Sequence, residues 1–286
     1  FEDKHTDAAA AQQAADTILE ALEQAKRPVI MLGHGVDSSF SQQKLIRFAQ
    51  KRQIPIITSV LAKSVLGYDH PLNFGCIGGA YGHRYANMIA NAKSDLLLCF
   101  GISLCTRQIG TKVHEFARGA KIIRIDIDPY NLQRDIHENG INEVKLQAET
   151  GAVIDCLAKA AAPDTEGISD WLNVCTEIKE NLQAVDDATP ERYPNRMIAD
   201  LSDMLEDTSA IAVDVGQHMV WSYQSFKNHE GQKLLFSGGH GAMGYGLPAA
   251  IGAYYATGKP TACICGDGAL QMNCLLYTSP SPRDMR

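Results

Sequence analysis

Short apolar runs alternate along the chain with segments whose apolar residues recur at helical spacing. In the first half, apolar runs predict strands at Val29–Leu32, Ile54–Ser59, Asp95–Gly101, Lys121–Ile127 and Glu143–Leu146. Helical spacing predicts helices at 8–25, 39–52, 83–92, 110–118, 129–138 and 149–161. Continuous apolar runs, as opposed to alternating ones, are typical of parallel strands that are buried on both faces. The pattern therefore predicts an α/β fold with a mainly parallel, Rossmann-like sheet of about five or six strands.

The second half shows the same alternation on a smaller scale. It predicts helices at 195–206 and 243–256 and strands at Ala210–Val215, Leu234–Ser237 and Thr261–Cys265. Another helix is predicted at 169–185, between the two halves. The domains that we expect are a linker helix at 1–25, a central domain at 26–162, a second linker helix at 163–190, the start of another α/β domain at 191–273 and a tail at 274–286.

The two ends of the sequence differ from the rest. The first residues, Phe1-Glu2-Asp3, show neither a starting Met nor a signal peptide, so we expect the chain to begin inside a longer protein. The segment 274–284 resembles a translated sequencing adapter, and its two prolines end any helix or central strand. We therefore expect the natural sequence to stop near Asn273 and the chain to be a fragment.

Composition excludes several classes of protein. With 45% hydrophobic and 21% charged residues, the chain falls among globular proteins. Its 26 Lys+Arg and 33 Asp+Glu residues give a net charge of −7, which offers little attraction to nucleic acid or to an anionic membrane. No apolar run approaches the roughly 18 residues of a membrane helix. The 8 cysteines lack the spacing of zinc ligands, so we expect free thiols in a reducing cytoplasm.

Glycine clusters follow many of the predicted strands. They are Gly33-His34-Gly35, Gly101, Gly216, Gly238–Gly244 and Gly266-Asp267-Gly268. Ligands of open parallel sheets bind beyond the carboxyl ends of the strands, and glycine lets the backbone approach a phosphate closely. The helix that follows such a loop adds free N–H donors. The clusters therefore predict a phosphate-binding edge.

Two chemical interpretations of this edge stay open at the level of motifs. Gly239-x-Gly241-x-x-Gly244 matches the dinucleotide fingerprint and favours a nicotinamide-dependent enzyme. The next carboxylate after it, Asp267, lies farther along the chain than that fingerprint expects. Asp267 stands between two glycines, where it suits a Mg²⁺ ion whose diphosphate partner is bound by the adjoining backbone N–H groups.

Three segments resemble the thiamine-diphosphate-dependent enzymes, namely Val213–His218, Ser237–Ala253 and Gly266–Asn273. The likeness is closest to the acetolactate (acetohydroxyacid) synthase large subunit, and it covers about residues 20–273. It implies a Rossmann-like central domain followed by a truncated thiamine-diphosphate-binding domain. The implied function is a carboligase or decarboxylase of 2-keto acids in branched-chain amino acid biosynthesis, which joins decarboxylated pyruvate to a second keto acid. The full-length parent would be a cytoplasmic homodimer or homotetramer.

The resemblance also implies which residues bind the cofactor. Thiamine diphosphate would be held by Gly216, Gln217, His218, Gly241, Met243, Asp267, Gly268 and Ala269. Among these, Asp267 would bind Mg²⁺, Met243 would lie under the thiazolium ring, and the Gly241 carbonyl would accept a hydrogen bond from the aminopyrimidine. The family's activating Glu belongs to an N-terminal domain that this sequence lacks. We therefore expect no catalytic residue within the chain, and no activity from the chain alone.

The family's central domain also binds FAD, and here the resemblance is partial. The positions that correspond to FAD-binding ones are Gly33, Gly35, Gly101, Arg107 and Asp126. Other positions depart from the family pattern, because Ser103, Tyr81 and Ala148 replace Arg, His and Asp. One expectation is thus an enzyme that contains FAD, and its alternative is a related 2-keto acid decarboxylase or carboligase without FAD. A non-catalytic nucleotide-binding module is the alternative from another class.

Overall fold

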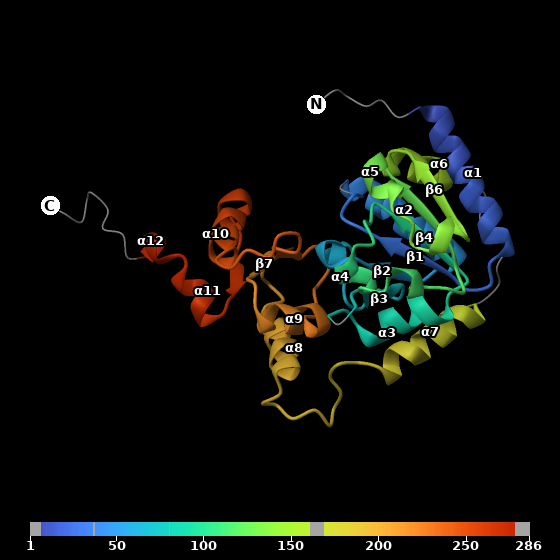
Figure 1. The fold of residues 1–286 in the computed structure, drawn as a ribbon. Helices are drawn as coiled ribbons and strands as arrows, with labels where there is room; N and C mark the ends of the chain where they lie inside the picture. The colour runs from blue at the N-terminus through green and yellow to red at the C-terminus, as the bar shows by residue number, and fades with distance from the viewer. Residues whose placement is uncertain (1–6, 37, 80, 161–168, 278–286) are drawn as a thin grey trace. The chain divides into compact units, whose positions relative to one another are not determined.

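The chain folds into two compact units, Phe1–Gln183 and Ala184–Arg286. A computed structural model describes residues 7–36, 38–79, 81–160 and 169–277 (Figure 1). Each unit contains a parallel sheet with helices, which confirms the predicted α/β class. Among the described residues, no helix combines the length and the apolar character that crossing a bilayer requires.

The first unit is built on a sheet of six parallel strands in the order β3-β2-β1-β4-β5-β6. The strands are β1 (Pro28–Leu32), β2 (Ile56–Thr58), β3 (Asn73–Cys76), β4 (Leu96–Phe100), β5 (Lys121–Asp126) and β6 (Glu143–Gln147). Ile30 at the centre pairs with Ile56 on one side and Leu98 on the other. The predicted parallel sheet is confirmed. Strand β3 was not predicted, because an Asn and a Gly interrupt its apolar pattern.

Short and long helices connect these strands. They are α1 (Ala8–Gln24), α2 (Ser39–Arg52), α3 (Arg84–Asn87) with the π-helical turn Met88–Lys93, α4 (Thr106–Ile109), α5 (Pro129–Gln133), α6 (Thr150–Lys159) and α7 (Asp170–Asn181). The helix predicted at 110–118 is wrong, since only a single turn forms there, at Val113–Glu115. Gly110 (φ 89°) and Ala117 (φ 46°) have left-handed backbone conformations, which a continuous helix excludes.

Helices α1 and α7, which the sequence suggested as linkers, both bury side chains in the core of the first unit. Helix α1 contributes Ile18, and α7 contributes Trp171. The indole Nε1 of Trp171 donates a hydrogen bond of 2.9 Å to the Pro28 carbonyl at the start of β1. The division between the two compact units falls after Gln183, and the domain boundaries proposed from sequence stay predictions.

The second unit contains three parallel strands in the order β8-β7-β9. Its elements are α8 (Pro194–Met204), β7 (Ala210–Val213), α9 (Gln217–Ser225), β8 (Lys233–Phe236), α10 (Gly246–Thr257), β9 (Thr261–Ile264), α11 (Asp267–Gln271) and α12 (Cys274–Tyr277). The pattern predicted these strands but missed α9, which has only a weak difference between its apolar and polar faces. Helix α12 contains the first residues of the predicted tail, and 278–286 lie outside the described residues.

Replacing Gly252 by Ala is expected to stabilise the second unit. Gly252 lies inside α10, and an added Cβ would meet open space. Since Gly in a helix interior costs about 0.5–1 kcal/mol relative to Ala, the free energy of unfolding should rise by about that amount. Urea unfolding, followed by Trp221 fluorescence in a Trp171→Phe background, measures the free energy of unfolding of this unit. As a matched control, Gly244→Ala should destabilise, because Gly244 has φ +85° and a Cβ there would lie 3.1 Å from Met272 Cβ.

Candidate functional site

Three loops leave the carboxyl edge of the smaller sheet. They follow β7 at 214–216, β8 at 237–245 and β9 at 265–266. Because β7 pairs in parallel with both β8 and β9, all three loops emerge at the same edge. Every residue predicted to hold thiamine diphosphate lies in one of these loops or at the start of the helix that follows it. The ligand roles of these residues stay predictions.

Asp214 is fully buried at the end of β7 and binds the backbone of the loop after β8. Its Oδ1 accepts a hydrogen bond of 2.9 Å from the Gly244 N–H, and its Oδ2 accepts one of 2.7 Å from the Gly246 N–H. Gly246 approaches so closely that an added Cβ would lie 3.0 Å from Asp214 Cβ. Asp214 thus fixes the loop at the point where α10 begins. The sequence pattern assigned no role to Asp214, although a carboxylate directly after an apolar strand can indicate a functional residue.

Exchanging Asp214 for Asn is expected to lower the free energy of unfolding of the second unit by about 1–3 kcal/mol. The amide NH₂ cannot accept a hydrogen bond, so one of the two glycine N–H groups loses its acceptor. Urea unfolding with Trp221 as the reporter measures the loss. Asp203→Asn is the control, because the Asp203–Lys227 ion pair lies at the surface of the same unit. Equal stability of the two variants would contradict the role given to Asp214.

His218 lies between the glycine loops after β7 and β9. A Cβ added to Gly216 would lie 2.6 Å from His218 Cε1, and a Cβ added to Gly266 would lie 3.4 Å from the same atom. The Nε2 atom of His218 is buried and has no hydrogen-bond partner among the described residues. A buried polar atom without a partner costs about 1–3 kcal/mol, so this nitrogen indicates a place where a polar group of a ligand fits.

The start of α9 adds further donors at this point. Gly216 is the N-cap residue and provides no side-chain hydrogen bond to the first turn. The first N–H groups of a helix lack partners within the helix, and the helix dipole favours an anion beside them. Gln217 is the first residue of this helix. Together with His218, the helix start has the donor chemistry that a diphosphate requires.

Met243 and the residues after β9 approach the same edge. The Cε of Met243 lies 3.9 Å from the position of a Cβ on Gly268, and Met243 remains 46% exposed. The neighbouring Asp267 is exposed, and its Oδ1 accepts a 2.8 Å hydrogen bond from the Gly268 N–H. Gly241 has open space around it and φ +75°. The structure thus brings Gly216, His218, Met243 and Gly268 to one edge, with Asp267 adjoining them.

The carboxyl edge of the larger sheet differs, because its glycines pack against one another. A Cβ on Gly33 would lie only 1.9 Å from the Gly101 carbonyl oxygen, and one on Gly35 would lie 2.8 Å from Gly101 Cα. The Gly35 N–H also donates a 3.0 Å hydrogen bond to the Gly101 carbonyl. Close packing of the loops after β1 and β4 therefore requires these glycines whether or not a ligand binds. Their assignment to FAD stays a prediction.

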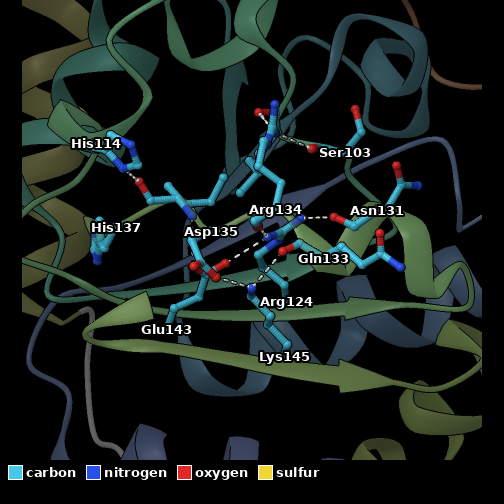
Figure 2. A network of polar contacts seen from close by, with 12 residues as sticks. Ser103, His114, Arg124, Asn131, Gln133, Arg134, Asp135, His137, Glu143 and Lys145 are labelled. Carbon is cyan, nitrogen blue, oxygen red and sulfur yellow. Dashed lines mark hydrogen bonds and ion pairs between the residues drawn. The ribbon is translucent and has the colours of Figure 1, made fainter. Parts of the chain in front are cut away.

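A pocket of about 430 Å³ opens at this edge. It is lined by Ser103, Cys105, Tyr130, Asn131, Gln133 and Arg134. Arg134 crosses from the segment after α5 to the loop after β4, where it donates hydrogen bonds to the Ser103 carbonyl (3.0 Å) and to the Leu104 carbonyl (Figure 2). Asp126, one of the positions suggested for FAD, contacts the pocket through a 3.4 Å hydrogen bond from Asn131. The sequence pattern does not predict this pocket.

A buried ion pair supports the pocket. Arg124 of β5 donates a 2.7 Å hydrogen bond from Nη1 to Glu143 of β6, and the two side chains are 2% and 0% exposed. The guanidinium also donates to the carbonyls of Asn131 and Arg134, and the second oxygen of Glu143 accepts a 2.9 Å hydrogen bond from the Ile136 N–H (Figure 2). The pair thus anchors the segment from Asn131 to Ile136. Arg124 is a charged residue within an apolar strand, and this sequence feature could have indicated the buried ion pair.

Two family models match the chain. "Thiamine pyrophosphate enzyme, central domain" matches residues 15–157, and "Thiamine pyrophosphate enzyme, C-terminal TPP binding domain" matches residues 214–277. The second match contains all the loops of the smaller sheet described above. The resemblance inferred from the motifs is therefore confirmed.

Similar proteins are acetolactate synthase large subunits. A "Probable acetolactate synthase large subunit" of Methanococcus aeolicus is 33% identical over 271 residues, which cover 90% of this chain and 44% of the relative. A protein with the same description from Methanocaldococcus jannaschii is 34% identical, covering 88% and 43%. The "Acetolactate synthase isozyme 1 large subunit" of Escherichia coli K12 is 32% identical, covering 87% and 43%. The chain thus spans less than half the length of these relatives.

Proposed function

The chain belongs to the thiamine pyrophosphate enzyme family, and we propose that its second unit binds the diphosphate of thiamine pyrophosphate together with Mg²⁺. The observation that carries this proposal is the buried, unpartnered Nε2 of His218 between Gly216 and Gly266. The Gly239–Gly244 fingerprint lies inside the segment matched by the TPP-binding model, which favours this diphosphate over a nicotinamide dinucleotide.

The residues present fit such a ligand. His218 and the start of α9 would donate hydrogen bonds to phosphate oxygens, and the backbone N–H group of Ala269 would donate from the other side. The Gly268 N–H, which donates to Asp267 Oδ1 in the structure, would join it by exchanging that carboxylate oxygen for a phosphate oxygen. Asp267 would supply a carboxylate to Mg²⁺, an ion that combines few carboxylates with phosphate oxygens. Met243 and Gly241 would contact the organic part of the ligand. Asp214 would act through the backbone, by holding the loop that contains both of these residues.

We propose further that the protein acts on 2-keto acids in the manner of an acetolactate synthase. When bound, thiamine pyrophosphate supplies the electron sink with which a 2-keto acid loses carbon dioxide. The similarity to acetolactate synthase large subunits supports pyruvate as the donor and a second keto acid as the acceptor. FAD is not part of this proposal, because packing accounts for Gly33, Gly35 and Gly101 and neither family description names a flavin. A homodimeric or homotetrameric state stays a prediction.

Removing the His218 ring tests the proposal, because the affinity for the ligand should fall while the stability of the unliganded unit should not. His218→Ala is expected to weaken Mg²⁺-dependent binding of thiamine pyrophosphate by about tenfold or more, which is the loss of one hydrogen bond to a charged group. Without ligand, the same change should leave the free energy of unfolding unchanged or raised, since it removes a buried nitrogen without a partner. Titration calorimetry and urea unfolding measure the two effects.

The control for His218→Ala is His240→Ala, because His240 is an exposed histidine in the loop after β8. Unaltered affinity in His218→Ala would refute the site.

A further inference from the structure

The pocket at the carboxyl edge of the larger sheet, about 430 Å³ in volume, takes no part in the proposed function. Its residues come from the loop after β4 and from the segment that begins with α5. Strands β4 and β5 pair in parallel up to Phe100 and Ile125, so both segments leave the sheet at the edge where ligands of parallel sheets bind. Small-molecule pockets measure about 300–1,000 Å³. The pocket lies near the lower end of that range and suits a ligand smaller than a dinucleotide.

Arg134 is the charged residue among those that line this pocket. Its Nη2 donates hydrogen bonds to the Ser103 carbonyl (3.0 Å) and to the Leu104 carbonyl, which fixes the guanidinium across the loop after β4 (Figure 2). In the part of the chain that the structure describes, no hydrogen bond involves its Nε or Nη1, and no carboxylate forms an ion pair with it. A cation held in place with free donors is prepared for an anion, because little side-chain entropy remains to be lost on binding.

The carboxylates around the pocket have other partners. Asp135 forms an ion pair with Lys145. Asp126 borders the pocket through the 3.4 Å hydrogen bond from Asn131, and its Oδ1 accepts a 2.9 Å hydrogen bond from the backbone N–H two residues later. Neither carboxylate belongs to the lining. A ligand in the pocket therefore meets the positive charge of Arg134 without a protein carboxylate that neutralises it.

Leu104 shows that the loop after β4 is held in a strained conformation. This residue has φ 49° and is fully buried. The left-handed conformation costs a residue with a Cβ about 1–2 kcal/mol, and residues held in this way cluster at ligand and active sites. The carbonyl of Leu104 is one of the two to which Arg134 donates. The strained loop is thus an indication of a ligand site that does not depend on the volume of the pocket.

We propose that this pocket binds a small carboxylate with an apolar body. The carboxylate would accept hydrogen bonds from Nη1 of Arg134 and from the side-chain amide of Gln133. The body would pack beside Cys105 and against the ring of Tyr130, which lines the pocket and is 76% exposed. Covering an exposed aromatic ring with an apolar group removes both surfaces from water, which favours binding. The site belongs to the first unit and does not depend on thiamine pyrophosphate.

Benzoate and its uncharged counterpart benzamide test the role of the charge, because the two molecules have nearly the same shape. Titration of each with the 286-residue chain, followed by the proton resonances of the small molecule, gives the two affinities. Benzoate should bind about tenfold or more tightly than benzamide, which is the contribution of one hydrogen bond between charged groups. Arg134→Gln should abolish this preference. Arg118→Gln is the matched control and should keep it, because Arg118 is an exposed arginine of the same unit.

A second variant, Tyr130→Ala, tests the apolar wall without changing the loop that Arg134 holds. Because Tyr130 is exposed, the fold should persist, and the affinities for benzoate and benzamide should fall by the same several-fold factor. An unsubstituted chain that binds neither molecule, or both equally, would overturn the proposal. A preference for benzoate that survives Arg134→Gln would do the same. Displacement of benzoate by FAD would also overturn it, since the pocket would then belong to a flavin dinucleotide.

Discussion

Replacing Glu143 by Leu is expected to lower the free energy of unfolding of the first unit by about 3–5 kcal/mol. The change leaves the Arg124 guanidinium, 2% exposed, without its carboxylate, and it also removes the acceptor of the Ile136 N–H. A buried charge that loses its partner keeps its desolvation cost without the attraction that offset it. Urea unfolding followed by Trp171 fluorescence in a Trp221→Phe background measures the effect on this unit.

Two further variants separate charge from packing. Lys145→Met breaks the neighbouring Lys145–Asp135 ion pair, which is more exposed, so the loss should be much smaller. The double variant Arg124→Met, Glu143→Leu should recover part of the stability, because no unpaired charge remains. A Glu143→Leu chain as stable as Lys145→Met would show that the buried pair does not anchor the segment beneath the pocket.

The second large effect is expected at Gly33. An added Cβ would lie 1.9 Å from the Gly101 carbonyl oxygen and 2.6 Å from Ile102 Cα, both of which are backbone atoms. No side-chain rotation relieves such a contact, so β1 and β4 would have to separate at the centre of the sheet. Overpacking of cores typically costs about 1–3 kcal/mol and occasionally more, and a backbone clash belongs to the upper end. Gly33→Ala should therefore unfold the first unit or destabilise it by about 3 kcal/mol or more.

Gly119→Ala is the matched control for Gly33. It introduces the same methyl group in the same unit, where a Cβ would meet no atom within 4 Å. Urea unfolding with Trp171 as the reporter should show a chain close to the unsubstituted one for Gly119→Ala and a large loss for Gly33→Ala. If both variants unfold alike, the contact between the loops after β1 and β4 does not hold the edge of the sheet together.

These glycines show why sequence patterns predict some features and miss others. Gly33 and Gly216 both follow an apolar strand, and by sequence both suggest a phosphate loop. In the structure, Gly33 lies against the backbone of Gly101, whereas Gly216 borders the ring of His218. The first arrangement requires glycine for packing, and the second leaves a buried ring nitrogen of His218 without a hydrogen-bond partner. Only the neighbours distinguish the two, and they come from distant parts of the chain.

Helices and strands were predicted correctly where the local spacing of apolar residues was distinct. Strand β4, apolar throughout, was predicted, and so was α2, with its spaced apolar residues. The helix expected at 110–118 failed because Gly110 and Ala117 adopt left-handed conformations that periodicity does not reveal. The role of Asp214 was not predicted, because its carboxylate oxygens accept hydrogen bonds from backbone N–H groups of a different loop. Such contacts depend on the sheet that brings the loops together.

In the function proposed above, the carboxyl edge of the smaller sheet binds a Mg²⁺ diphosphate through Asp267 and the loops around His218. The ³¹P resonances of thiamine pyrophosphate, recorded with increasing amounts of the chain, report on this binding even when it is weak. With Mg²⁺, both resonances should shift or broaden with the unsubstituted chain and with Asp203→Asn. The perturbation should disappear when Mg²⁺ is chelated or when Asp267 is replaced by Asn, since the charge that holds the ion is lost. Equal perturbation by the unsubstituted chain and by Asp267→Asn, or none by either, would show that this edge does not bind the diphosphate through Asp267.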